Sequence, residues 1–220
     1  IKRLKVFLII FEANEEGYEI YKEKISGKLP EYSYKTIAQI VDEGIAKGDV
    51  VFLAHSHFSN LHMWSPQIDV LAKSFRVVAY DIRGHGLSET SDESFSLKDL
   101  AYDAIKLMDF LNIEKVHFIG LSLGGMIAMS TAINFSSRLK SLVLADTSAQ
   151  MPKRIWDERI SIAIAEGSVK SLVKPTIERW FTDDFRTRSQ DTCQTMKSIA
   201  NSTSLAGYVG CAAAIREMDL

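Results

Sequence analysis

The stretch Gly120-Leu121-Ser122-Leu123-Gly124-Gly125 decides the fold, because it places a serine between glycines where a strand gives way to a helix. Residues 115–119 form a short apolar run typical of a buried strand, and residues 126–135 are apolar nearly all round. Glycines on either side of Ser122 allow close backbone approach, so the turn can lift the hydroxyl above the sheet. The pattern predicts a nucleophile at residue 122, and a plain glycine-rich turn is the alternative.

Apolar runs alternate with helical patterns along the first two thirds of the chain. The predicted strands are Val50–Ala54, Phe75–Tyr80, Val116–Ile119 and Leu142–Ala145, and helices are predicted over 67–72, after Ser65-Pro66, and over 97–111, after Ser96. Upstream, residues 18–25 and 34–41 predict an antiparallel hairpin. Alternating strands and helices indicate an α/β fold with a mostly parallel, doubly wound sheet.

The pattern becomes helical after Asp146 and shows no further strand. Helices are predicted over 154–166, over 168–181 and around 205–215, and Pro175 is expected to kink or restart its helix near Lys174. We interpret residues 1–17 as an N-terminal extension, 18–147 as the α/β core and 148–220 as a helical lid. The lid is expected over the carboxyl edge of the sheet, where open α/β sheets bind ligands.

Composition excludes several classes of partner. The chain has 220 residues, 46% of them hydrophobic, and a formal net charge of −2 with no basic stripe, which argues against nucleic acid. The apolar run Val6–Phe11 is too short to span a bilayer. Cys193 and Cys211 match no zinc or redox spacing, so we expect reduced thiols in a cytoplasmic protein, with no metal or cofactor. The oligomeric state stays open.

Two further motifs accompany the serine turn. His55-Ser56-His57-Phe58 follows one predicted strand, and residues 81–88, Asp-Ile-Arg-Gly-His-Gly-Leu-Ser, follow the next. In this order and spacing the motifs resemble the α/β-hydrolase superfamily, in which the serine turn is a nucleophile elbow. The resemblance implies that the backbone amides of His57 and Leu123 form an oxyanion hole, with each donor worth about 3 kcal/mol in the transition state.

The predicted lid narrows this resemblance. Residues 156–160, 178–181 and 207–220 are similar to 3-oxoadipate enol-lactonases, which open a lactone ring in the breakdown of aromatic compounds. This implies hydrolysis of a small carboxylate-bearing enol-lactone through an acyl-enzyme on Ser122. For the substrate carboxylate we expect a lid arginine, Arg216 first and Arg159 or Arg179 as alternatives. Trp64 and Trp180 are expected to wall the pocket.

In α/β hydrolases the catalytic serine precedes the catalytic acid and histidine along the chain. All five histidines, His55, His57, His62, His85 and His117, precede Ser122. We therefore expect the acid, the histidine and two final strands to lie beyond Leu220, so that the chain as given is a fragment with an uncovered apolar edge at residues 142–145. Asp146 is an alternative acid, with a hinge or helix-capping role favoured.

Two rival functions stay open. One is another activity of the same fold, a carboxylesterase or a cofactor-free perhydrolase acting on other acyl compounds. The other is a ligand-binding or sensor protein that keeps the pocket without appreciable turnover. An experiment can distinguish these two rivals, because the first turns over acyl compounds, whereas the second only binds its ligand stoichiometrically.

Overall fold

The computed structural model describes residues 40–44, 47–90 and 94–220. The predicted extension 1–17 lies outside the described residues, and so does the predicted hairpin, except for residues 40 and 41 at the end of its second strand. The strands are β1 (Ile40–Gly44), β2 (Val50–Ala54), β3 (Arg76–Tyr80), β4 (Val116–Leu121) and β5 (Leu139–Ala145). They form one sheet in the order β1-β3-β2-β4-β5, in which only the β1–β3 pair is antiparallel within the described part of the chain. This confirms the mostly parallel sheet.

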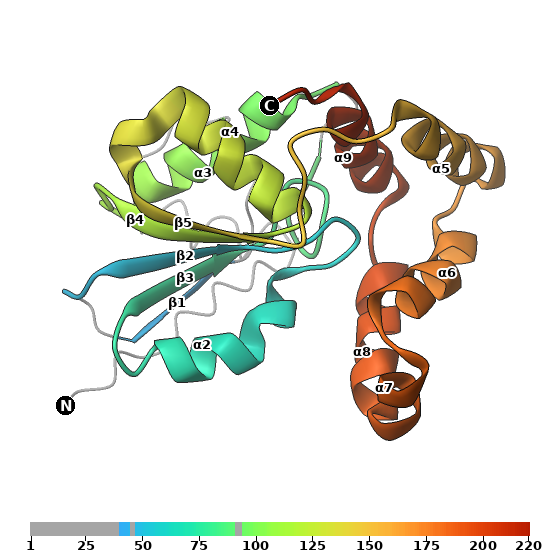
Figure 1. Ribbon diagram of the computed structural model, residues 1–220, viewed down its shortest axis with the longest axis horizontal. Coiled ribbons are helices and arrows are strands. Elements are labelled where there is room, and N and C mark those ends of the chain that lie inside the picture. The colour runs from blue at the N-terminus through green and yellow to red at the C-terminus, as the bar shows by residue number, and fades with distance from the viewer. Residues whose placement is uncertain (1–39, 45–46, 91–93) are drawn as a thin grey trace, which may run out of the picture.

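Helices cover both faces of the sheet (Figure 1). Helices α3 (Leu97–Phe110) and α4 (Leu123–Phe135) lie on one face, and the 3-10 turn η1 (Leu61–Trp64) with α2 (Ser65–Leu71) lies on the other. The strand residues alternate between these two faces, so Phe52 and Val78 pack beneath α3 and α4 while Leu53 and Val77 pack toward α2. Burial of both faces explains the uninterrupted apolar strands.

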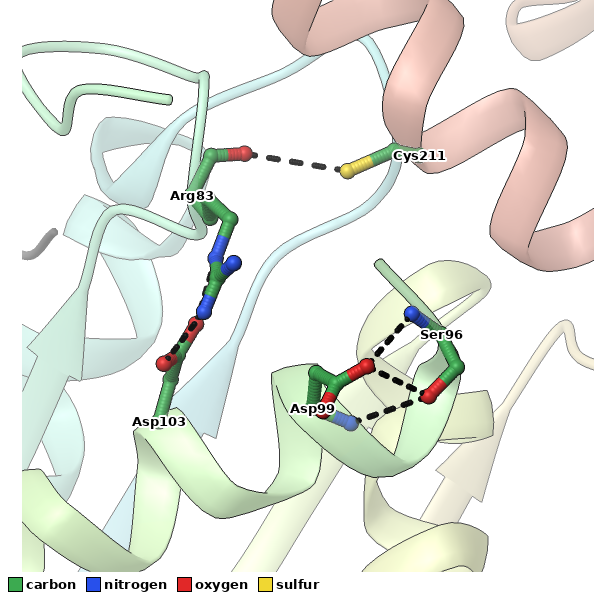
Figure 2. Close-up of polar contacts among 5 residues, drawn as sticks. All are labelled: Arg83, Ser96, Asp99, Asp103 and Cys211. Carbon is green, nitrogen blue, oxygen red and sulfur yellow. Dashed lines mark hydrogen bonds and ion pairs between the residues drawn. The ribbon is translucent and has the colours of Figure 1, made fainter. Parts of the chain in front are cut away.

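Helix α3 begins with a capping box. The Ser96 Oγ accepts a hydrogen bond from the Asp99 N–H, and the Asp99 carboxylate accepts from the Ser96 N–H at 2.8 Å (Figure 2). This reciprocal pairing satisfies two backbone donors at the helix start. The predicted start of this helix is therefore confirmed.

The lid consists of the helices that follow β5. These are α5 (Lys153–Glu166), α6 (Lys170–Trp180), α7 (Asp183–Arg188), α8 (Gln190–Asn201) and α9 (Leu205–Glu217), which lie beside one end of the sheet in Figure 1. Of the two expected effects of Pro175, a kink or a restart, the restart is wrong, because α6 continues through Pro175. The missing N–H of Pro175 leaves the carbonyl of Ser171 without its helical donor, and Ser171 is exposed, so water can replace that donor.

The first helical turns of α9 dock on the turn after β3. A Cβ added to Gly207 would meet the Gly84 carbonyl oxygen at 2.0 Å, so the two backbones touch. The Arg83 carbonyl accepts a hydrogen bond from the Cys211 thiol at 3.7 Å, and the Arg83 guanidinium binds Asp103 of α3 through two contacts, at 2.8 and 2.9 Å (Figure 2). The turn thus links the lid to the core.

Strand β5 is an edge of the sheet in the described part of the chain. Its residues are partly or fully exposed, and Val143 and Leu144 retain 50% and 43% of their accessible surface. The central strand β2, in contrast, is buried along its whole length. The predicted uncovered apolar edge is therefore present.

Candidate active site

Ser122 lies in the turn between β4 and α4 with a strained backbone. Its φ of 53° and ψ of −113° fall in a region that residues other than glycine rarely adopt. The Ser122 N–H donates to the Ala145 carbonyl at 2.9 Å, and the Ser122 carbonyl accepts from the Met126 N–H and the Thr147 hydroxyl. These bonds hold the strained turn in place. The side chain is partly exposed, and Oγ has no hydrogen-bond partner among the described residues.

The two glycines around Ser122 are required by close backbone contacts. A Cβ on Gly120 would lie 2.2 Å from the Gly124 carbonyl oxygen, and a Cβ on Gly124 would lie 2.1 Å from the Ala54 carbonyl oxygen. Neither backbone oxygen can move without displacing helix α4, which holds Gly124, or strand β2, which holds Ala54. The G-x-S-x-G pattern is thus a steric requirement for bringing β4, α4 and the end of β2 together.

The backbone N–H groups of His57 and Leu123 carry no hydrogen bond within the described part of the chain. Leu123 is the first residue of α4, so its N–H is one of the donors that a helix start leaves unpaired. His57 follows β2, and the Gly124 N–H donates to the neighbouring His55 carbonyl at 3.1 Å, which joins the loop to the start of α4. Unpaired donors of this kind suit an anionic oxygen.

Buried side chains on both segments join the turn after β3 to the loop at 55–61. The His85 Nε2 accepts from the Phe58 N–H at 3.0 Å, and the His55 Nε2 accepts from the Ile82 N–H at 2.8 Å. The Asp81 carboxylate accepts from the Leu61 N–H at 2.8 Å. Phe58 has a positive φ of 68°, so its strained conformation depends on such support.

Burial shifts the pKa values of the supporting side chains His55, His85 and Asp81. It lowers the pKa of His55 to about 3 and the pKa of His85 to about 4, which leaves both rings neutral and able to accept hydrogen bonds. Burial also raises the pKa of Asp81 to about 6, against the opposing effect of its two backbone donors. Asp81 therefore holds both its own turn, through the Leu87 N–H, and the loop, through the Leu61 N–H.

The His57 side chain connects the loop to the lid. Its Nε2 lies 3.0 Å from the Tyr208 carbonyl oxygen in α9, which requires the protonated nitrogen to donate. The ring packs against the Tyr208 ring at 4.5 Å and the Trp156 ring at 5.5 Å. Burial sets the pKa of His57 well below its ordinary value, so the imidazole is neutral. It is a packed, positioning side chain.

A cavity of about 800 Å³ opens between the sheet and the lid, beside Ser122. Ser122 and His57 contribute from the core, and Asp146, Thr147 and Ser148 follow β5 into its wall. The apolar part of the lining comes from both layers: Phe58, Met63, Leu121, Met126, Met151, Ile155, Trp156, Trp180, Phe181, Met196 and Tyr208. The other polar members are Ser56, Arg159, Thr176 and Arg179. A concave site with an apolar wall and placed polar groups suits a small organic ligand.

Three of the five side chains predicted to contact the substrate line the cavity, and two do not. Trp180, Arg159 and Arg179 line the cavity. Arg216 does not, which corrects its first ranking: it lies in the last turn of α9, where its guanidinium binds Asp157 and Glu217. Trp64 does not line the cavity either, because it is buried among the residues between α2 and the sheet. Sequence reasoning missed Trp156 and Tyr208, although their places on the apolar faces of two lid helices marked both as inward-facing.

Asp146 lines the cavity with a positive φ of 42° directly after β5. No hydrogen bond joins it to a histidine in the described residues. Likewise, no histidine there is bonded to the Ser122 Oγ, since His55 and His85 are engaged with backbone groups. Among the described residues no group of three or more potential ligands is arranged to hold a metal, and no helix is long and apolar enough to cross a bilayer.

The geometry is that of an α/β hydrolase, and comparison with known proteins agrees. The family model for the alpha/beta hydrolase fold matches residues 49–165, more than half of the chain. The chain belongs to the α/β hydrolase fold family.

Within that family the chain is similar to enol-lactonases. A 3-oxoadipate enol-lactonase of Acinetobacter baylyi is 36% identical over 72% of this chain and 59% of its own length. A second one from the same organism is 28% identical over 91% of this chain and 73% of its own length. The crystal structure of the enol-lactonase from Burkholderia xenovorans matches with a TM-score of 0.80 and 31% identity, over 83% of this chain and 71% of that one. The chain thus spans less than two thirds of the first relative.

Proposed function

We propose that the protein is a serine hydrolase that opens a small carboxylate-bearing enol-lactone through an acyl-enzyme on Ser122. The observation that carries the proposal is the strained, partly exposed Ser122 at the cavity wall, with an Oγ that no described residue binds. Strain of this kind persists only where the surrounding structure enforces it, and it is common at reactive residues. Similarity to enol-lactonases supports the choice of substrate.

The proposed reaction has two stages. Ser122 Oγ attacks the lactone carbonyl as its proton passes to a base, and the amides of His57 and Leu123 stabilise the resulting oxyanion. The ring C–O bond then breaks to give the acyl-enzyme and an enol, and water hydrolyses the acyl-enzyme to release a carboxylate. No described histidine is bonded to the Ser122 Oγ, so the proposal assigns no base, and it keeps Asp146, which lines the cavity, as a candidate acid. A cytoplasmic location fits Cys193 and Cys211, which are both free and buried.

The test replaces the nucleophile. Ser122→Ala is expected to lower turnover of an enol-lactone by about 10⁶-fold in the complete protein, as loss of a triad member does in other serine hydrolases. Ser136→Ala is the matched control, since Ser136 lies at the far end of α4 and outside the cavity lining. A serine-directed phosphonate should add its mass to Ser122 in the unmodified protein and the control. Unchanged turnover in Ser122→Ala would exclude the mechanism.

The same assay separates the rivals. Faster turnover of simple aryl esters than of an enol-lactone would favour a carboxylesterase of the same fold. Stoichiometric binding of the lactone without phosphonate labelling would favour a sensor. We expect preference for the lactone together with labelling.

A further inference from the structure

Two arginines line the cavity beside Ser122 without an acidic partner. Arg159 comes from α5 and Arg179 from α6, the first two lid helices. Neither forms an ion pair with a carboxylate in the described residues. Other arginines of the same chain do, for example Arg83 with Asp103 and Arg216 with Asp157. Because guanidinium groups near a mostly apolar wall lose part of their hydration, unpaired arginines there are available to an anionic ligand.

The position of Arg159 is fixed by stacking. Its guanidinium carbon lies 5.0 Å from the centre of the Trp156 ring, and that ring lies 5.5 Å from the His57 ring. A cation over an aromatic ring is attracted by the ring face and needs no hydrogen-bond acceptor for this contact, so its N–H groups stay available to another partner. His57, Trp156 and Arg159 thus form a row of contacts along the wall of one cavity. The row ends at Arg159, whose N–H groups are available to a ligand.

Arg179 adds a second charge to the same space. Burial lowers the pKa of Arg179, and the neighbouring positive charge of Arg159 lowers it further, while Tyr208 and Asp146 act in the opposite direction. The titratable groups that line the cavity are Arg159, Arg179, Asp146, Tyr208 and the neutral His57. Two cations against one carboxylate leave the cavity positive, so a bound anion would relieve the repulsion between the arginines.

We propose that Arg159 and Arg179 form a carboxylate-binding subsite, which seats the acid group of an acyl substrate while its carbonyl lies at Ser122. The assignment of the reacting carbonyl rests on the proposed function, whereas the binding of a carboxylate does not. The planar forks of two arginines can donate several parallel hydrogen bonds to one carboxylate. The subsite thus selects singly charged acyl compounds over neutral ones of the same size.

Binding to a non-hydrolysing form tests the subsite separately from the reaction. Calorimetry with the Ser122→Ala full chain compares monomethyl adipate, which carries one carboxylate and one ester, with the neutral dimethyl adipate. We expect the charged ester to bind at least about 10-fold more tightly at low salt. The preference should shrink as salt screens the arginines, a measurement that needs no further substitution.

Paired variants identify the residues. Adding Arg159→Gln and Arg179→Gln together should abolish the preference, and Arg159→Lys with Arg179→Lys, which keeps the charge, should retain part of it. Arg216→Gln, outside the cavity, is the matched control and should keep the preference. Equal affinities for both esters, no binding of either, or a preference that survives the double glutamine variant would overturn the proposal. Failure of Ser122→Ala to reduce turnover would instead overturn the proposed function and leave the subsite standing.

Discussion

Ser122 keeps a backbone conformation that its own side chain disfavours. A φ of 53° with a ψ of −113° costs a residue with a Cβ about 1–3 kcal/mol. The close contacts of Gly120 and Gly124 with neighbouring carbonyls hold the turn in this conformation. Selection for stability alone would place glycine here. Serine at this position agrees with the proposed nucleophile, because the strain gives no gain in stability.

This strain predicts an unusual ranking of two substitutions. Ser122→Gly should have a free energy of unfolding about 1 kcal/mol or more above that of Ser122→Ala, because glycine relieves the strain. Denaturant unfolding of both variants measures the difference. Ser136, with φ −53° and ψ −32°, is the control, and there alanine should be the more stable by about 0.5–1 kcal/mol. The same ranking at both positions would argue against strain at Ser122.

At the scale of elements, helix α9 and the turn after β3 meet backbone to backbone. Gly207→Ala should destabilise the protein by about 1–3 kcal/mol, since the new methyl group would overlap the Gly84 carbonyl. It should also lower turnover, because α9 carries Tyr208, which accepts the hydrogen bond from His57. Unfolding free energies and kcat/KM measure the two effects.

Gly210→Ala provides a matched comparison in the same helix. Its added methyl group would meet the ring of Phe95, a partly exposed side chain that can move aside, so the loss should be smaller. Equal losses for Gly207→Ala and Gly210→Ala would show that the backbone contact has no special importance.

Strand β5 offers a second prediction at this scale. Because Val143 and Leu144 are exposed on a strand with one unpaired edge in the described structure, the 220-residue chain should self-associate as its concentration rises. Val143→Lys should reduce this association, measured by light scattering after size-exclusion chromatography. Val70→Lys is the control, since Val70 is 62% exposed but lies on α2. A monomer at all concentrations would contradict the prediction.

The sequence predicts the strands and the serine turn better than it predicts the side chains that line the cavity. Apolar runs determine the strands, since Val50–Ala54 is found as predicted, and the steric demands of Gly120 and Gly124 fix the serine turn. Which lid side chains reach the cavity depends instead on how the lid helices pack. Arg216 lies eight residues after Tyr208, about 12 Å further along α9, and so beyond the cavity. Arg159 could have been ranked higher, because it lies one helical turn after Trp156.

For the whole molecule, buried neutral histidines make stability depend on pH. His55, His57 and His85 have depressed pKa values in the folded protein, so below about pH 6.5 the unfolded chain binds protons that the folded protein does not. Each such proton lowers the unfolding free energy by about 1.4 kcal/mol per pH unit. Asp81, whose pKa burial raises to about 6, acts in the opposite direction between pH 6 and 4.

Burial also raises the pKa of Asp103, which acts in the same direction as Asp81. The three histidines outweigh the two carboxyl groups, so the chain should lose stability as the pH falls from 7.5 to 5. Denaturant unfolding at a series of pH values measures this loss. His85→Gln removes one titrating ring and should make the dependence shallower by about one proton. Stability that stays level down to pH 5 would show that these histidines are not buried as described.

The cavity is built by two stretches of chain with separate tasks. Residues up to 147 hold the serine, its turn and the loop beside it, whereas Trp156, Arg159, Arg179 and Trp180 all come from the helices after β5. Under the proposed function, substitutions in the helices after β5 should therefore change which acyl group the cavity admits while the strained turn at Ser122 stays as it is.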